Sequence, residues 1–262
     1  MKVKPYLLLV CLGFMCSCSR YYYTPNGVNA PMLTKANDAH ISANVSLNSN
    51  GTFTDIQASY SPVKHLGIIG NYSSFSYQRD DINVANGEVN AYARIGELGA
   101  GYYYATDMGM EQFIFDIYGG AGTGYLQSDV NMNLHRYFVQ PGIGIRTPYF
   151  EVSLNYRIAA LKYSNLNING HDSTYLADNK LIYGNSNDKS IVSNAYWFSE
   201  PAITLRGGYK FIKIQTQYVL SSAISQVPWK YGTSEMSIGI SFELEDLLGA
   251  IKNSRNKRSK IE

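Results

Sequence analysis

The stretch Phe-Glu-Val-Ser-Leu-Asn-Tyr-Arg-Ile, residues 150–158, alternates strictly between apolar and polar side chains. A period of two is typical of a β-strand, in which successive side chains point to opposite faces. Residues 236–244 and 139–146 alternate in the same way, and so does the shorter stretch 203–206. The sequence therefore predicts strands that have one apolar and one polar face.

Ten segments of this kind follow one another along the chain. They are residues 40–47, 52–61, 66–77, 91–105, 113–126, 134–146, 150–163, 198–209, 211–221 and 236–244. The connections after the second, fourth, sixth and eighth segments are short, and most of the others are longer. This pattern is typical of an all-β, antiparallel up-and-down transmembrane β-barrel with short periplasmic turns and longer extracellular loops. We expect about ten strands, or eight if the first pair lies outside the barrel.

The composition favours a membrane barrel over a soluble one. Charged residues make up 16% of the chain, below the usual quarter, and there are 23 Tyr. No apolar run approaches the length of a membrane-spanning helix. A soluble sandwich or ligand-binding barrel would also alternate, with its apolar face turned inward. We favour the membrane barrel because the polar faces carry isolated charges among Gly, Ser and Thr, without the charge density of a wetted surface.

Aromatic residues gather near both ends of the expected strands, as in the girdles of membrane barrels. The group beside the short turns comprises Tyr60, Tyr102, Tyr104, Phe113, Phe115, Tyr149, Phe150, Tyr209, Phe211 and Phe242. The group beside the longer loops comprises Tyr77, Tyr125, Tyr137, Tyr163, Trp197, Trp229 and Tyr231.

Charges on the inner face of a narrow barrel need partners of opposite sign. We predict an interior charge network made of Glu97, Asp116, Arg136, Arg146, Glu151, Arg157, Glu200 and Arg206. Inward side chains would fill so small a lumen and leave no wide pore. Arg94 departs from the pattern because it shares the parity of the apolar Leu98. A β-bulge or a position outside the bilayer would each account for it.

The N-terminal residues predict export and lipidation. Lys2 and Lys4 precede an apolar run at residues 6–15, the pattern of a secretory signal. The small residues that follow are similar to a bacterial lipobox, in which Cys18 would carry acyl chains such as palmitate. An ordinary secretory signal with incidental cysteines is the alternative. The expected organisation is a signal peptide at 1–17, a lipidated tether at 18–36, the barrel at 37–245 and a basic tail at 246–262.

Three segments together resemble a family of uncharacterised outer-membrane β-barrel lipoproteins from Bacteroides-like bacteria. They are Tyr-Thr-Pro-Asn-Gly-Val-Asn-Ala-Pro-Met-Leu at residues 23–33, Arg-Tyr-Phe-Val-Gln-Pro at 136–141 and Glu-Pro-Ala-Ile-Thr-Leu-Arg at 200–206. The resemblance implies a barrel in the outer membrane. It supplies no activity.

Residues with catalytic chemistry form no clear constellation. The histidines lie in separate segments without the spacing of metal ligands, so we predict no metal or other cofactor. Asp80 and Asp81 in a loop, together with His135 near a rim, are the only candidates for a small-barrel hydrolase site. Solvated loop charges explain the two aspartates more simply, and we expect no enzyme.

The remaining expectations concern partners and placement. Removing Lys2 and Lys4 from the 22 basic residues leaves 20 against 20 acidic residues, so no nucleic-acid partner is implied. The polar stretch 164–195 is long enough to have a function. Its residues Tyr175, Leu181, Ile182 and Tyr183 could contact a protein partner. An even strand number places both chain ends on the periplasmic side. A soluble periplasmic, lipid-tethered barrel that binds an apolar ligand remains the alternative function.

Overall fold

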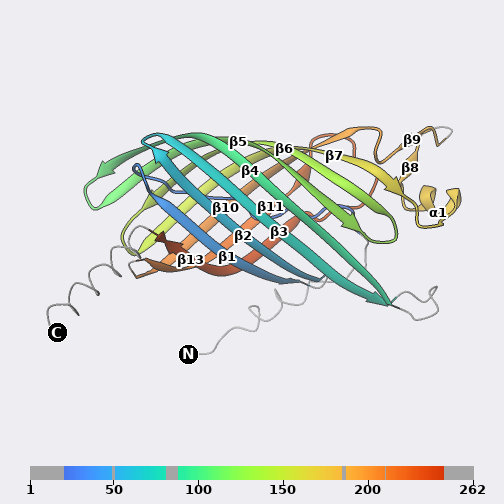
Figure 1. Cartoon of the computed structure of the whole chain (residues 1–262), viewed down its shortest axis with the longest axis horizontal. Coiled ribbons are helices and arrows are strands. Elements are labelled where there is room, and N and C mark those ends of the chain that lie inside the picture. The colour runs from blue at the N-terminus through green and yellow to red at the C-terminus, as the bar shows by residue number, and fades with distance from the viewer. Residues whose placement is uncertain (1–20, 49–50, 81–87, 185–186, 210, 245–262) are drawn as a thin grey trace, which may run out of the picture.

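The computed structural model describes residues 21–48, 51–80, 88–184, 187–209 and 211–244 (Figure 1). Cys18, Asp81 and the predicted basic tail lie outside these residues. The ordered elements are β1 (Ala39–Asn48), β2 (Gly51–Val63), β3 (Leu66–Asp80), β4 (Glu88–Met108), β5 (Glu111–Gln127), β6 (Asn131–Arg146), β7 (Phe150–Asn167), α1 (Ser173–Asp178), β8 (Ile182–Tyr183), β9 (Lys189–Ser190), β10 (Ala195–Tyr209), β11 (Ile212–Leu220), β12 (Ser222–Ala223) and β13 (Ser234–Glu243).

Ten long strands form a closed antiparallel β-barrel, which confirms the predicted fold. Each strand from β1 to β6 pairs with the next, β7 pairs with β10, β10 with β11, and β11 with β13. The barrel closes where β13 pairs with β1 over His40↔Glu243 to Val45↔Ile238. The eight-strand alternative is wrong, because β1 and β2 are full members of the barrel.

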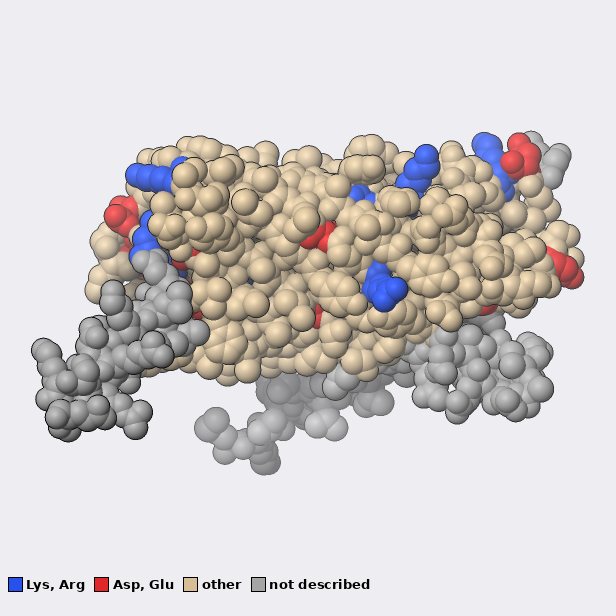
Figure 2. Space-filling model, viewed as in Figure 1, with Lys and Arg blue, Asp and Glu red and all other residues tan. Residues whose placement is uncertain are grey.

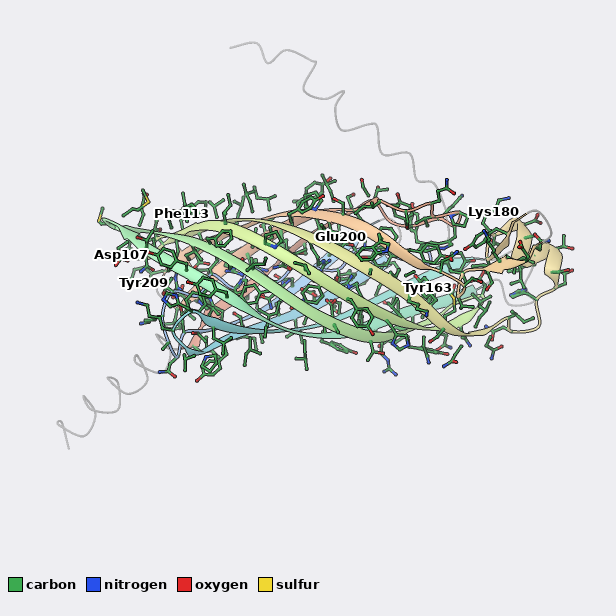
Figure 3. The ribbon with its side chains drawn as sticks, turned by 90° about the horizontal axis from the view of Figure 1, so that it is seen from above. Asp107, Phe113, Tyr163, Lys180, Glu200 and Tyr209 are labelled. Atoms are coloured by element: carbon green, nitrogen blue, oxygen red, sulfur yellow. The ribbon has the colours of Figure 1, made fainter. Side chains whose placement is uncertain are left out.

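The two ends of the barrel differ. The connections β2–β3, β4–β5, β6–β7 and β10–β11 are short and lie at one end, here called the turn end. At the other end, called the loop end, lie α1, β8 and β9 (Figure 1). Figure 3 shows the same division, with Tyr163 and Lys180 toward the loop end and Asp107, Phe113 and Tyr209 toward the turn end.

The apolar faces of the strands point outward and the polar faces inward. On β7, Leu154 and Tyr156 are 50% and 44% exposed, whereas Ser153, Asn155 and Arg157 between and beside them are buried. β13 and β6 repeat this pattern. Mostly uncharged residues accordingly cover the face of the barrel shown in Figure 2. The expectation for a soluble ligand-binding barrel, an apolar inner face, disagrees with this arrangement.

The N-terminal segment lies inside the barrel. Residues 21–38, here called the thread, belong to no strand, and only Asn37 and Asp38 at its end make backbone hydrogen bonds with Ser61 of β2. Val28, Ala30 and Leu33 of the thread are completely buried. The predicted tether at 18–36 thus lies within the barrel from residue 21 onward, where an irregular tether would be expected in solvent. Pro25, Gly27 and Pro31 keep this segment out of regular secondary structure. The wall of the barrel encloses the segment.

The thread runs from the loop end to the turn end. The Tyr22 amide donates to the Lys230 carbonyl, and the Gly232 amide donates to the Tyr23 carbonyl. Lys230 and Gly232 belong to the β11–β13 connection at the loop end. At its other end the thread leads through Asp38 directly into β1 at the turn end. The start of the thread therefore lies at the end of the barrel opposite to the short turns. An even strand number fixes only the end of the barrel at which β1 begins. The thread then places Tyr22 and Tyr23 at the opposite end.

Gly27 lies at a close approach between the thread and the wall. A Cβ atom at this position would overlap the Asp55 carboxylate and the Gln57 amide on β2. Gly96 on β4 has free space beside it, because a Cβ there would meet no atom within 4 Å.

We predict that Gly27→Val destabilises the folded barrel, because an overpacked interior typically costs about 1–3 kcal/mol. The matched control Gly96→Val should change stability by no more than about 0.5 kcal/mol. The measurement is the urea midpoint of unfolding in detergent, followed by tryptophan fluorescence. Equal midpoints for the two variants would mean that residues 21–38 do not occupy the lumen.

Candidate functional site

The candidate site is the polar interior of the barrel, whose side chains surround the thread. An extended chain enclosed by a barrel must satisfy its backbone amides and carbonyls without joining a sheet. Here long side chains of the wall do this. The Gln217 side chain accepts from the Val28 amide at 2.9 Å and donates to the Val28 carbonyl at 2.6 Å. Gln140 donates to the Asn29 carbonyl at 2.6 Å.

Arginines of the wall bind the remaining carbonyls. Arg157 donates to the Asn26 and Gly27 carbonyls at 3.0 and 3.3 Å. Arg206 donates to the Ala30 carbonyl at 2.7 Å, and Arg146 to the Met32 carbonyl at 3.0 Å. Five wall residues from β6, β7, β10 and β11 thus hold the thread by its backbone from Asn26 to Met32.

Two asparagines of the thread reach the wall with their side chains. The Asn29 amide donates to Asn71 Oδ1 at 2.8 Å and to the Ala58 carbonyl at 2.9 Å. The Asn26 amide donates to Glu97 Oε2 at 2.8 Å and to Ser73 Oγ at 3.1 Å. The thread therefore contacts β2, β3 and β4 as well as the opposite wall.

Two groups of charges line the lumen, and the first surrounds Tyr23 and Asn26. Arg136 contacts Glu97 at 2.6 Å, and Arg157 contacts Glu200 at 2.5 Å. The Tyr23 hydroxyl donates to Glu200 and accepts from Arg136 at 3.0 Å. Arg136 also donates to the Asn26 side chain. Two cations and two anions balance, and all four side chains are at most 1% exposed.

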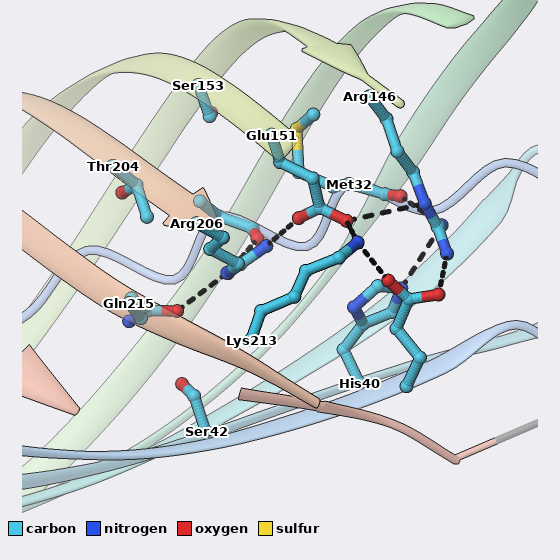
Figure 4. Close-up of polar contacts among 12 residues, drawn as sticks. Met32, His40, Ser42, Arg146, Glu151, Ser153, Thr204, Arg206, Lys213 and Gln215 are labelled. Carbon is cyan, nitrogen blue, oxygen red and sulfur yellow. Dashed lines mark hydrogen bonds and ion pairs between the residues drawn. The ribbon is translucent and has the colours of Figure 1, made fainter. Parts of the chain in front are cut away.

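The second group lies toward the turn end (Figure 4). Glu151 accepts from Arg206 at 2.8 Å and from Lys213 at 2.7 Å, and Lys213 also contacts Glu243. Arg146 contacts Glu243 at 2.6 Å and Asp38 at 2.9 Å. The charges of this group also balance, with the cations Arg146, Arg206 and Lys213 and the anions Glu151, Glu243 and Asp38. Asp38 belongs to the thread.

Seven of the eight residues predicted for the interior network belong to these two groups. Asp116 is the exception. It is buried on the inner face of β5, and its Oδ1 atom has no hydrogen-bond partner among the described residues. The sequence reasoning missed Lys213, Glu243 and Asp38. Lys213 and Glu243 share the inward parity of their strands, so the alternation could have found them. Asp38 could not be found in this way, because it precedes the first alternating segment at residues 40–47 and has no strand parity.

Asp38 joins the end of the thread to the wall. Its Oδ2 atom accepts from the Thr34 amide and from Arg146, and its Oδ1 atom lies 3.3 Å from His40 Nε2. These contacts bind the carboxylate of the thread to Arg146 of β6 and to His40 of β1.

An aromatic and aliphatic cluster closes the loop end. Trp229 packs edge-on against Tyr163 and Tyr196, with ring centroids 5.7 and 5.1 Å apart, and the Tyr23 ring lies 4.6 Å from Phe198. Tyr163 and Trp229 were expected in an outward girdle. They face inward instead, at 1% and 2% exposure. Trp197 and Tyr137 do face outward. The connections at this end supply an apolar cap, which a prediction based on strand ends alone does not anticipate.

The predicted functional loop 164–195 is folded over this cap. Leu176, Leu181 and Ile191 are buried in the cluster, and Tyr175 donates to Asp129 at 2.7 Å. Leu181 was expected to contribute to an exposed contact surface and is instead completely buried. The opposite face of the segment carries exposed polar residues, including Asp172, Ser173 and Lys180.

The predicted hydrolase residues do not come together. His135 on β6 is level with Thr123 on β5, Gly96 on β4 and Tyr72 on β3. Asp80 is eight residues farther along β3, about 26 Å at 3.3 Å per residue. In the described parts of the chain, no group of three or more His, Cys, Asp or Glu could hold a metal ion. No helix among the described residues is long and apolar enough to cross a bilayer.

Arg94 points outward near the loop end. The pairing of β4 with both of its neighbours continues through Arg94 without a break in register, so no bulge explains this residue. Its guanidinium lies 6.0 Å from the centre of the Tyr92 ring. It is level with Thr54, three residues from the loop end of β2. Lys162 on β7 is likewise exposed toward this end.

The comparisons with known proteins assign the chain to no family. No family model matches it, and no curated protein matches it.

We predict that removing one partner of a buried ion pair is costly. Arg136→Met leaves Glu97 without its main counter-charge, and such changes typically cost about 3–5 kcal/mol. The double variant with Glu97→Leu should cost less than the sum of the single changes, with a coupling of about 0.5–3 kcal/mol. Denaturant unfolding of all four proteins measures this coupling, and the exposed Arg94→Met serves as control. Strict additivity would contradict the pairing.

Proposed function

We propose that this chain is an outer-membrane β-barrel lipoprotein with a structural or interaction role. The observation that carries the proposal is the inside-out distribution of side chains, with apolar residues around the outer wall and paired charges within. A wall of this kind is stable where lipid surrounds it, because apolar surface is then not exposed to water.

The height of the apolar wall fits a bilayer. From Phe150 to Ala160, β7 advances ten residues with only apolar and uncharged side chains facing outward. At about 3.3 Å per residue and a tilt of about 40°, this stretch rises about 25 Å, the height of the apolar band of such barrels. Lys162 follows beyond it. Among the described residues, the Arg and Lys side chains on the wall between the rims are Arg94 and Lys162, both toward the loop end. There they can reach anionic headgroups.

The filled lumen argues against a pore through which solutes diffuse. The thread occupies the barrel along its length, and side chains from the wall surround it. A solute would have to displace the buried ion pairs and hydrogen bonds of the thread. We therefore propose no pore function and no enzymatic activity.

Lipidation at Cys18 and contact through the loop end complete the proposal. The lipobox-like residues 16–19 favour an acyl chain at Cys18, beside the start of the thread. The folded segment 164–195 turns its polar face away from the barrel, and a protein partner would bind there. Outer-membrane lipid is the second proposed partner, along the apolar wall.

The experiment is gel mobility in SDS with and without boiling. We expect a heat-dependent shift for the outer-membrane fraction and continued membrane association of Cys18→Ala, since the wall alone holds the barrel in lipid. Leu154→Arg, in the middle of the wall, should lower stability by roughly 2–4 kcal/mol, because an Arg faces lipid at mid-bilayer depth. Met110→Arg at the 90% exposed turn is the control and should have little effect. Release of Cys18→Ala into the soluble fraction, together with no heat shift, would overturn the proposal.

A further inference from the structure

The direction of the thread determines where the N-terminus of the mature chain emerges. Its contacts advance in order along the barrel. Tyr22 and Tyr23 bind the β11–β13 connection at the loop end, Asn26 binds Arg136 and Arg157, and Ala30 binds Arg206. A final set of contacts joins Met32 and Asp38 to Arg146 at the turn end. The chain preceding Tyr22 therefore continues from the loop end.

The point of entry is fixed by several independent contacts. The Tyr163 hydroxyl donates to the Tyr22 carbonyl, and the Tyr22 hydroxyl donates to Asp129 at 2.8 Å. The Tyr23 ring packs on Phe198. These partners come from β7, from the β5–β6 connection and from β10. They hold Tyr22 and Tyr23 beneath the same cap that Trp229 closes.

Covalent length limits where a lipid on Cys18 can lie. Cys18 precedes Tyr21 by three residues, which span at most about 10 Å when fully extended. The hydrocarbon core of a bilayer is about 30 Å thick. An acyl chain on Cys18 therefore cannot reach the leaflet at the turn end around the outside of the barrel. The thread itself occupies the route through the lumen.

We propose that the lipid on Cys18 inserts into the leaflet at the loop end, which is the outer leaflet, and that the mature N-terminus is displayed at the cell surface. This inference rests on the proposed function, both for the lipid and for the orientation of the loops. It is opposite to the periplasmic position that an even strand number suggests. The barrel carries its own N-terminus across the membrane, because residues 21–38 cross the lumen before β1 begins.

The test is an epitope inserted between Ser19 and Arg20 of the full-length protein and detected by antibody on intact cells, which antibody cannot enter. The expected result is a signal that does not increase when the outer membrane is permeabilised. Incorporation of labelled palmitate, absent in Cys18→Ala, shows that the lipid is attached. If the insertion abolishes the heat-dependent gel shift, Tyr21→Cys with a membrane-impermeant maleimide replaces it.

Two control variants separate this inference from the proposed function. Ser173→Cys in α1 marks the loop end and Met110→Cys marks the turn end, and both positions are exposed. Reaction of Ser173→Cys on intact cells, with an epitope that is detected only after permeabilisation, overturns the inference and leaves the proposed function standing. Reaction of Met110→Cys on intact cells, with none at Ser173→Cys, overturns the orientation and the inference together. Absence of palmitate incorporation overturns lipidation and with it the inference.

Discussion

The structure depends on how an enclosed extended chain satisfies its backbone polar groups. A segment without sheet partners would leave amides and carbonyls unpaired, each at a cost of about 1–3 kcal/mol. The side chains of Gln140, Gln217 and three arginines make the hydrogen bonds that a neighbouring strand would otherwise supply, because they are long enough to reach the thread. These five donors lie on β6, β7, β10 and β11. On β3, where Asn71 and Ser73 are shorter, asparagine side chains of the thread reach the wall instead. The barrel is narrow enough for these side chains to meet the thread, and too narrow to remain empty around it.

Charge balance is the second consequence of a filled lumen. Each arginine that binds a carbonyl of the thread brings a charge out of water, and such a charge is tolerated only beside an anion. The structure pairs Arg157 with Glu200 and Arg206 with Glu151, and it completes the group at the turn end with Asp38. The thread thus contributes to the electrostatic balance that holds it. Balanced groups of this kind also specify position, because moving the thread by one residue would separate Asp38 from Arg146 and would bring a side chain larger than that of Gly27 against Asp55.

Much of the fold was predictable from the sequence, and the thread was not. Period-two alternation identified the strands and their faces, since burial on one side alone produces that pattern. Residues 21–38 have no periodicity and contain Pro25, Gly27 and Pro31, so they look like any irregular connection. One signal was present. The only charged residues of this stretch are Lys35 and Asp38, both near its end, whereas a solvated tether is normally richer in charge. The cap was missed because residues 181–183 and 191–192 are short apolar runs in a polar segment, and only the folded loop brings Leu181 and Ile191 into one cluster with Trp229.

The order of assembly follows from the same geometry. The barrel closes between β1 and β13, and the thread leads directly into β1. Glu243 on β13 contacts both Arg146 and Lys213, and Arg146 also holds Asp38 and the Met32 carbonyl. The contacts that join the closing strands are therefore continuous with those that fix the end of the thread. Closing the barrel around a thread already in place requires no chain end to move through the lumen. Inserting the thread afterwards would draw the whole N-terminal end past two groups of buried ion pairs. The geometry therefore favours closure around a thread already in place, with Glu243 near the β1–β13 junction contacting the residues that fix the end of the thread.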